Sequence, residues 1–258
     1  MTAEPPVMNA APESTESASP DGRLAVPPAP VTSLSDPRAV QILSTEHWSL
    51  LASRSLAYNE AFIRGGMFLT FLSMSFVGLA LLAQAMSFTS QFFAAAVVVL
   101  AFDFIIGVLT FVRIAGANVD DLRSVHGMAR IRHGYTEIAP VVAPYFTSAT
   151  HDDIDSVLTA YGSPSKNALG ELAYGLSTSG GMIGLITAMV GGVLAALVAF
   201  LLGAGGEVAI LLGVVAGAVV FALLVFLTFR AAAGFQVALG VRFPAPPEAT
   251  PEEPAATQ

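Results

Sequence analysis

The segment FFAAAVVVLAFDFIIGVLTFV, residues Phe92–Val112, decides how the rest of this sequence folds. About 20 apolar residues in a helix, at a rise of about 1.5 Å per residue, cross the ~30 Å hydrocarbon core of a bilayer. Lipid offers no hydrogen-bond partner to a peptide group, so a segment of this kind must satisfy its backbone as a helix. The segment therefore predicts a transmembrane helix, and it carries a single acid, Asp103.

Three further segments have the same character: Met67–Met86, Met182–Leu202 and Val208–Phe229. The whole chain is 54% hydrophobic and only 12% charged, whereas soluble domains carry about 25% charged residues. Helices buried in a soluble bundle would show a polar stripe with a period of 3.6 residues, and these four segments show none. We expect an all-α integral membrane protein with four transmembrane helices in two hairpins, at 67–112 and 180–229.

The basic residues predict the orientation in the membrane. Lys and Arg collect in cytoplasmic segments near membrane ends. The short loops Ser87–Gln91 and Gly203–Glu207 contain neither residue type, which places both loops outside and both termini inside. The basic residues all fall in the tails and the central loop: Arg23, Arg38, Arg54, Arg64, Arg113, Arg123, Arg130, Arg132, Lys166, Arg230 and Arg242.

Composition also excludes several classes of function. The chain has no cysteine, so disulfides, thiol catalysis and Cys-ligated zinc are ruled out. Its net charge of −8 comes mainly from the two tails, which argues against nucleic-acid binding.

The composition of the two tails predicts disorder. Residues 1–35 are rich in Pro and Ser and predict a disordered cytoplasmic tail. The C-terminal tail spans 230–258 and is expected to be disordered from about residue 243.

Helices are predicted to continue from the membrane into the cytoplasm. Asp36 can cap a helix whose first residue is Pro37, and residues 36–66 contain no breaker before Gly65, so this helix leads into span one. Span two continues past Arg113 into a cytoplasmic helical module, residues 113–179. Apolar residues recur every three positions along its first part: Val119, Leu122, Val125, Met128 and Ile131. Two adjacent helices with such stripes should pack together, with Trp48 expected in their core rather than as a ligand platform.

A short amphipathic helix is expected within this module. Thr150 and Asp153 have capping-box spacing, and Gly162 suits the position after the helix end. The apolar face consists of Ile154, Val157, Leu158 and Tyr161.

Two groups of residues in this module have side chains that could bind a metal. They are the sequence HDDID, residues 151–155, and the pair His126 and His133. Acids in the first turn of a helix are favoured by its dipole without any metal, and the histidine pair has no third ligand nearby. We therefore predict no metal site and no cofactor.

Small residues recur at every fourth position in the second pair of spans. In lipid, rows of this kind allow helix backbones to approach closely. We expect spans three and four to pack on each other through them, and contact between copies in a homo-oligomer is the alternative. The rows contain Gly180, Gly184, Ala188, Gly192 and Ala196 in span three, and Ala209, Gly213 and Gly217 in span four.

Asp103 is the one ionisable residue inside the four spans. It lies ten residues beyond Arg113, about 15 Å along a helix, and hence near the bilayer midplane. Ser73 and Ser75 have matching depth in span one. An acid at this depth costs about 2.5–3.5 kcal/mol on insertion scales, so Asp103 should face the other helices. Either it is a neutral, hydrogen-bonded structural group, or it forms a proton or cation site.

Parts of the sequence resemble a group of uncharacterised bacterial multi-spanning membrane proteins. The similar stretches are TEHWSLLASRS, NEAFIRGGMFL, HGMARIRHGYTEIAPVVAPYF and HDD, within about residues 44–160. The resemblance implies a bacterial inner membrane and assigns no functional residue.

No phosphate-binding loop, nucleophile elbow, zincin or dinucleotide motif is present in the sequence, so we do not expect an enzyme. The sequence favours a binding, scaffolding or signalling component of the inner membrane, with the lipid bilayer and an unidentified cytoplasmic protein as partners. A small channel or a proton- or cation-coupled transporter that uses Asp103 is the alternative.

The predicted orientation can be tested with reporter fusions. Fusions at Thr89 and Gly205 should report the outer side of the membrane, whereas fusions at Ser163 and at the C-terminus should report the inner side. The physical reason is that basic residues are retained in the cytoplasm. An inner-side signal at Thr89 would contradict this topology.

Overall fold

A computed structural model describes residues 30–162, 170 and 175–246, with the side chains of 231–233 and 235–239 set aside. Over the described residues the chain is helical and contains no strand. The expected tail over residues 1–29, the tail beyond 246 and the loop residue Lys166 lie outside this description. The elements are α1 (Pro37–Met86), α2 (Ser90–Ile138), η1 (Pro140–Tyr145), α3 (Ile154–Leu158), η2 (Thr159–Tyr161), α5 (Ser179–Leu201) and α6 (Gly206–Leu239).

Four helices of the described chain, α1, α2, α5 and α6, are long and apolar enough to cross a membrane. Helix α1 begins where the sequence predicts. Asp36 accepts a hydrogen bond from the backbone N–H of Arg38 at 2.9 Å, and Pro37 occupies the first turn. With no proline after its first residue, α1 runs for 50 residues. Helix α2 contains no proline, continues past Arg113 and is 49 residues long.

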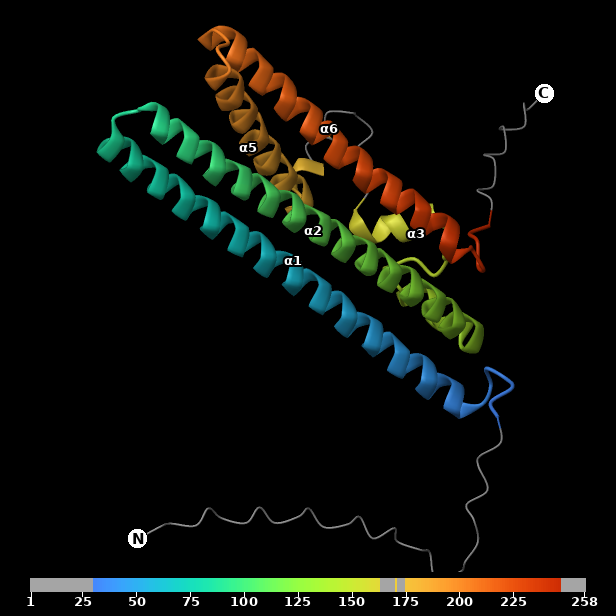
Figure 1. Cartoon of the computed structure of the whole chain (residues 1–258). Helices are drawn as coiled ribbons and strands as arrows, with labels where there is room; N and C mark the ends of the chain where they lie inside the picture. The colour runs from blue at the N-terminus through green and yellow to red at the C-terminus, as the bar shows by residue number, and fades with distance from the viewer. Residues whose placement is uncertain (1–29, 163–169, 171–174, 247–258) are drawn as a thin grey trace, which may run out of the picture.

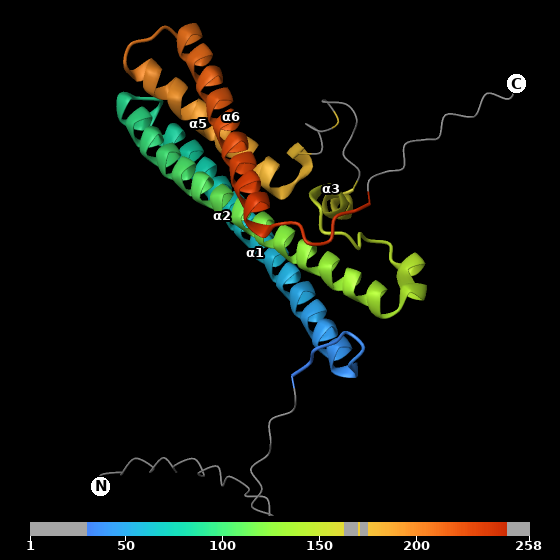
Figure 2. The same ribbon diagram turned by 90° about the vertical axis from the view of Figure 1, so that its right-hand side faces the viewer.

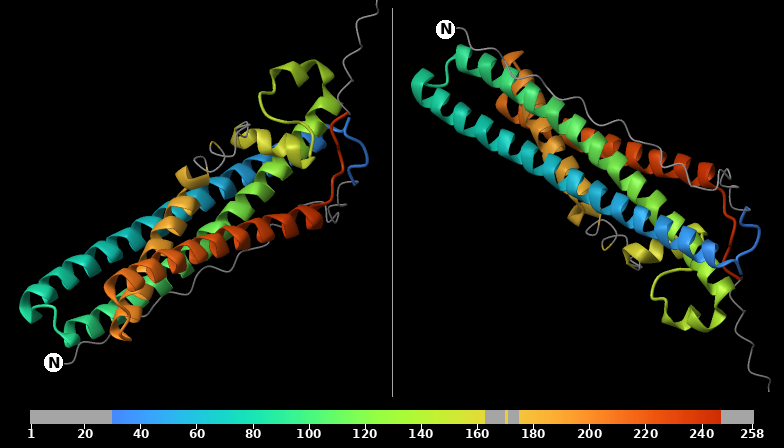
Figure 3. Two further views of the ribbon diagram at one scale, coloured as in Figure 1. Left: turned by 90° about the horizontal axis from the view of Figure 1, so that it is seen from above. Right: turned by 90° about the horizontal axis from the view of Figure 1, so that it is seen from below.

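Helix α2 lies between the other long helices (Figure 1). It packs along α1 on one side and against α5 on another, while α6 packs mainly on α5. In the view from below, α2 lies between α1 and α6 (Figure 3). Large side chains from three helices fill the junction of α1, α2 and α5, where Phe68, Ile114 and Ile183 are almost fully buried. Helix α2 therefore joins the two pairs of apolar helices.

The parts of α1 and α2 that precede Met67 and follow Val112 form what we call the polar extension, residues 37–66 and 113–138. This extension has its own core, in which Val125, Met128 and Ala129 of α2 surround Val157 of α3. Leu50 of α1 packs against the same cluster. Figure 2 shows α3 lying beside α2 in this region.

Helix α3 begins later than the predicted capping box implies. Asp153, rather than Thr150, is its N-cap, because the Asp153 carboxylate accepts the backbone N–H of Ser156 at 3.0 Å. Gly162 ends the following turn with a φ of 95°, a conformation that suits glycine. The Thr-x-x-Asp spacing located the start of the helix to within one turn, but a closer acceptor caps it.

Trp48 does not lie in the core that we expected for it. Its side chain is 67% exposed, because α1 turns another face, represented by Leu43 and Leu50, toward Gly134 and Gly127 of α2. Apolar residues occur on more than one face of this part of α1, so the sequence alone does not reveal which face is buried.

The small-residue row of α5 divides between two neighbours. Gly180 and Gly184 face α2, next to Ile114 and Phe111 respectively. Gly192 instead meets the backbone of Gly213 in α6. Residues four apart advance by about 40° around a helix, so a row of this length passes from one face to the next. Small residues thus allow α5 to approach both α2 and α6, and not α6 alone.

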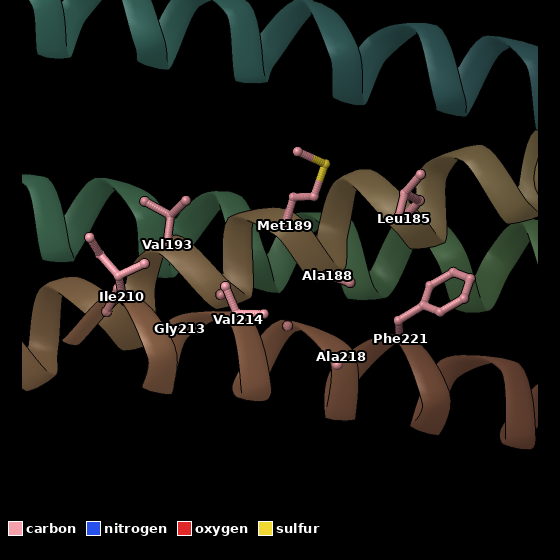
Figure 4. Close-up of a pocket in the computed structure, with 12 residues that line it drawn as sticks. Leu185, Ala188, Met189, Val193, Ile210, Gly213, Val214, Ala218 and Phe221 are labelled. Carbon is pink, nitrogen blue, oxygen red and sulfur yellow. The ribbon is translucent and has the colours of Figure 1, made fainter. Parts of the chain in front are cut away.

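The close approach of α5 and α6 leaves an apolar groove of about 510 Å³ on their outer surface (Figure 4). Its floor is formed by Ala188, Gly192 and Gly213, and its rim includes Met189 and Val214. Every residue that lines the groove is apolar or glycine. It can accept an acyl chain or an apolar helix, but it offers no group for chemistry.

The seam between α5 and α6 should tolerate no added carbon. A Cβ on Gly192 would lie 2.7 Å from the carbonyl oxygen of Gly213, and forced overpacking costs about 1–3 kcal/mol. Gly192→Ala should therefore lower the thermal stability of the purified protein in detergent. Gly78→Ala is the matched control, since a Cβ there meets nothing within 4 Å. Equal stability of the two variants would show that this seam is not tightly packed.

Candidate functional site

Asp103 lies at the junction of three helices and has no exposed surface. On α2 it follows Leu100 and precedes Gly107, both of which are buried. The Ser75 hydroxyl of α1 donates a hydrogen bond to Asp103 Oδ1 at 2.9 Å. The structure thus brings together two of the three residues that the sequence singled out.

Ser73, the third residue of the predicted site, does not reach Asp103. Its hydroxyl instead donates to the backbone carbonyl of Leu69, one turn earlier in α1, at 2.8 Å. Ser73 and Ser75 are two positions apart and so point about 200° apart around the helix. Only one of them could face α2, and depth alone did not show which.

The second carboxylate oxygen of Asp103, Oδ2, is buried without a hydrogen-bond partner among the described residues. Thr187 of α5, another buried polar residue, donates to the carbonyl of Ile183 in its own helix at 2.8 Å. Thr187 packs instead on Gly107, one turn from Asp103. A lone buried acceptor of this kind costs free energy unless it carries a proton or meets a small ligand.

A second buried aspartate, Asp121, organises the polar extension. Its carboxylate accepts hydrogen bonds from Arg54 Nε at 2.8 Å and from the Tyr161 hydroxyl at 2.6 Å. The Tyr58 hydroxyl donates to it at 3.3 Å. The Arg54 guanidinium also lies 5.6 Å from the centre of each tyrosine ring, within the range of a cation–π contact. Four residues from α1, α2 and η2 are therefore held together by one carboxylate.

Burial raises the pKa of Tyr161, and the hydrogen bond that it donates to Asp121 raises this pKa further. Tyr161 therefore stays protonated and remains a donor. Sequence reasoning missed this cluster because Asp121 stands in the charged run DDLR, which is typical of a solvated helix face. The only available indication was its spacing of four residues before Val125, on the buried side of α2.

At the boundary between the apolar segments and the extension, Glu60 links α1 to α2. Arg113 of α2 donates to both of its carboxylate oxygens at 2.8 Å, and Arg64 donates at 2.9 Å. The hydrogen bonds from Arg113 and then Arg64 lower the pKa of Glu60 to about 2. This ion-pair group leaves one net positive charge beside the apolar segment.

The acids of the HDDID sequence make contacts within the protein. Asp153 caps α3, and Asp152 is fully buried against Arg130 of α2, with Oδ2 at 2.7 Å from Nε. His126 Nε2 lies 3.8 Å from the same oxygen. Within the described residues no group of three potential metal-binding side chains comes together.

No family model, curated protein or solved structure matches this chain.

The two serines of span one allow a matched test of the Asp103 contact. Ser75→Ala removes the hydrogen bond to Asp103 and should destabilise the protein by about 0.6–2 kcal/mol, the usual size of such bonds between membrane helices. Ser73→Ala removes only a bond to its own helix and should have a smaller effect. Thermal unfolding in detergent measures both. A larger loss for Ser73→Ala would contradict this assignment.

The Glu60 ion pairs should resist acid. Because the folded pKa of about 2 lies below the ordinary value of 4.5, their contribution to stability is present above pH 4.5. It is lost as the pH falls from 4.5 through 2. In a ¹³C NMR titration of the carboxyl group in micelles, Glu60 should titrate near 2, and Arg113→Gln should raise its midpoint. A midpoint near 4.5 in the unaltered protein would contradict the ion pairing.

Proposed function

We propose that this chain is a binding, scaffolding or signalling component of a bacterial inner membrane. The four apolar helices cross the bilayer as two hairpins, and the polar extension, α3 and both termini lie in the cytoplasm. The absence of basic residues from the two short loops supports this orientation. In this arrangement the membrane helices anchor the extension, and the extension contacts the partner.

The observation that carries this proposal is a line of exposed apolar side chains on α1. Trp48, Leu51, Tyr58 and Phe62 are 67%, 41%, 51% and 80% exposed. With Ser55 they follow a spacing of 3, 4, 3 and 4 residues, which is the spacing that helices use to pack along one another. We call these five positions the α1 stripe.

Lipid does not cover most of the α1 stripe under this orientation. Trp48 precedes Met67 by 19 residues, about 28 Å along the helix, well beyond the hydrocarbon core. Exposed aromatic side chains that gather on one face of a soluble region mark protein contacts. The spacing fits a partner that lays an apolar helix along α1.

Transport is the second candidate function, and one observation favours it. Asp103 Oδ2 is buried near the midplane without a hydrogen-bond partner among the described residues, and ionisable groups at this depth often form proton or cation sites. Transport, however, requires water or an ion to reach Asp103. Its carboxyl group has no exposed surface, and Ser75 occupies one of its oxygens. We therefore rank it below binding.

Site-specific photo-crosslinking in native membranes tests the binding function. A photoreactive phenylalanine analogue at Trp48 or Phe62 should give one discrete crosslinked product, because these side chains face the partner helix. The same analogue at Glu46, which is exposed on a different face of α1, is the matched control. The Trp48 product should decrease when Leu51→Ser is added.

Equal crosslinking at Trp48 and Glu46 would contradict a specific docking face, as would no product at either stripe position. A product of twice the mass of the chain would identify a second copy as the partner. It would then replace the proposed separate protein with a homo-oligomer that uses the same stripe.

A further inference from the structure

The chain that follows α6 turns back onto the polar extension. Gly240 ends α6 with a φ of 58° and a ψ of 137°, a combination that only glycine adopts readily. Residues 240–245, which we call the C-terminal segment, then contact Asp152, Asp153 and the last part of α2. The sequence predicts a disordered tail from about residue 243, and its Pro-rich composition does not indicate the backbone hydrogen bonds that Phe243 and Ala245 make here.

Backbone groups make most of the contacts of this segment. The N–H groups of Arg242 and Phe243 donate to the Asp152 carboxylate at 3.0 and 2.7 Å. The Phe243 carbonyl accepts from the N–H of Asp152 at 3.1 Å. The N–H of Ala245 donates to Asp153 at 2.9 Å. Two carboxylates and one main-chain N–H thus bind backbone groups of the segment, so these contacts do not depend on the side chains that the segment carries.

The Asp152 carboxylate accepts hydrogen bonds from several donors and remains charged. Burial alone would raise its pKa, but the N–H of Arg242, the Arg130 side chain and the N–H of Phe243 together hold the pKa below its ordinary value. Arg130 also donates to the carbonyl of Gly240 at 2.5 Å. Arg130 thus binds the start of the segment at Gly240, and the Asp152 carboxylate binds it at Arg242 and Phe243.

One side chain of the segment provides selectivity. The Phe243 ring stacks on His133 of α2, with the ring centres 4.2 Å apart and an angle of 24° between the planes. The His151 ring also lies next to His133, with the ring centres 5.9 Å apart. The surface therefore distinguishes an aromatic residue at this position, while the neighbouring residues Arg242, Pro244 and Ala245 are exposed.

The segment is held mainly by polar contacts, and Phe243 is its one half-buried residue. Regions of this kind open at low free energy relative to a packed core. When the segment leaves, water can solvate the Asp152 carboxylate, and Arg130 remains as its ion-pair partner. The surface itself persists, because His133 belongs to α2 and Asp153 continues to cap α3.

We propose that His133, Asp152 and Asp153 form a binding site for an extended peptide with an aromatic residue, and that residues 240–245 are its exchangeable intramolecular ligand. The site is separate from the α1 stripe and does not depend on the partner proposed for it. Because the ligand continues directly from α6, its release would free the end of a membrane helix from the extension.

A pair of spin labels on the full chain tests this proposal. The chain has no native cysteine, so Thr147→Cys and Ala245→Cys label two exposed positions on either side of the contact. Pulsed EPR should give one narrow distance distribution. Asp152→Asn should broaden it, because the amide cannot accept all the backbone donors, whereas Asp155→Asn, an exposed acid in the same sequence, should not. Phe243→Ala should also broaden the distance distribution, because it removes the stacking on His133. The backbone N–H groups that bind Asp152 and Asp153 are still present in this variant.

Exchange is tested by adding the peptide GVRFPAP, the sequence of residues 240–246, to the labelled full chain. A tethered ligand has an effective concentration in the millimolar range, so a few mM of peptide should displace about half of the segment. The same peptide with Ala in place of Phe should displace much less. If either peptide fails to change the distribution, or both act equally, the site is not an exchangeable aromatic-peptide site. An Asp152→Asn distribution as narrow as the original would also overturn the proposal.

Discussion

The unbroken helical backbone of α2 is the constraint on which the rest of the structure depends. Its apolar half must be helical because lipid cannot satisfy peptide groups, and no breaker stops the helix before Ile138. One rigid element therefore carries Asp103, Arg113, Asp121 and Arg130 in fixed order. Helices α1 and α5 pack against its apolar half, and α3 and the C-terminal segment bind its polar half. Positions in the membrane and in the extension are thus linked by a single helix.

Three buried aspartates show how differently the same side chain can be accommodated. Asp121 and Asp152 are each paired with an arginine and with further donors, which offsets the free-energy cost of burying charge. Asp103 has one serine, and no Lys or Arg occurs in the four apolar segments 67–86, 92–112, 182–202 and 208–229. The two paired carboxylates hold segments of the extension together, whereas Asp103 joins two helices by a single bond. This contrast favours the extension as the part of the molecule that binds partners.

Sequence patterns predicted the elements better than their contacts. Length and hydropathy indicated four membrane-length helices, and the Asp36–Pro37 pair gave the start of α1, because both depend on local physics. Which face of a helix is buried depends on its neighbours. Trp48 was therefore misplaced, and the small-residue row of α5 could not be divided between α2 and α6. In the candidate site, depth selected Ser73 and Ser75 together, but only their rotation about α1 selects Ser75.

We propose that the membrane region is closed around Asp103 and that partners bind to the polar extension. The accessibility of residue 103 to water tests this most directly, and the cysteine-free sequence makes the measurement simple. Asp103→Cys in intact membranes should not react with a membrane-impermeant maleimide, whereas Thr89→Cys, in the exposed turn between α1 and α2, should react rapidly. Both should react after denaturation. Labelling of Asp103→Cys at a rate comparable to Thr89→Cys would reveal an aqueous path and contradict the account.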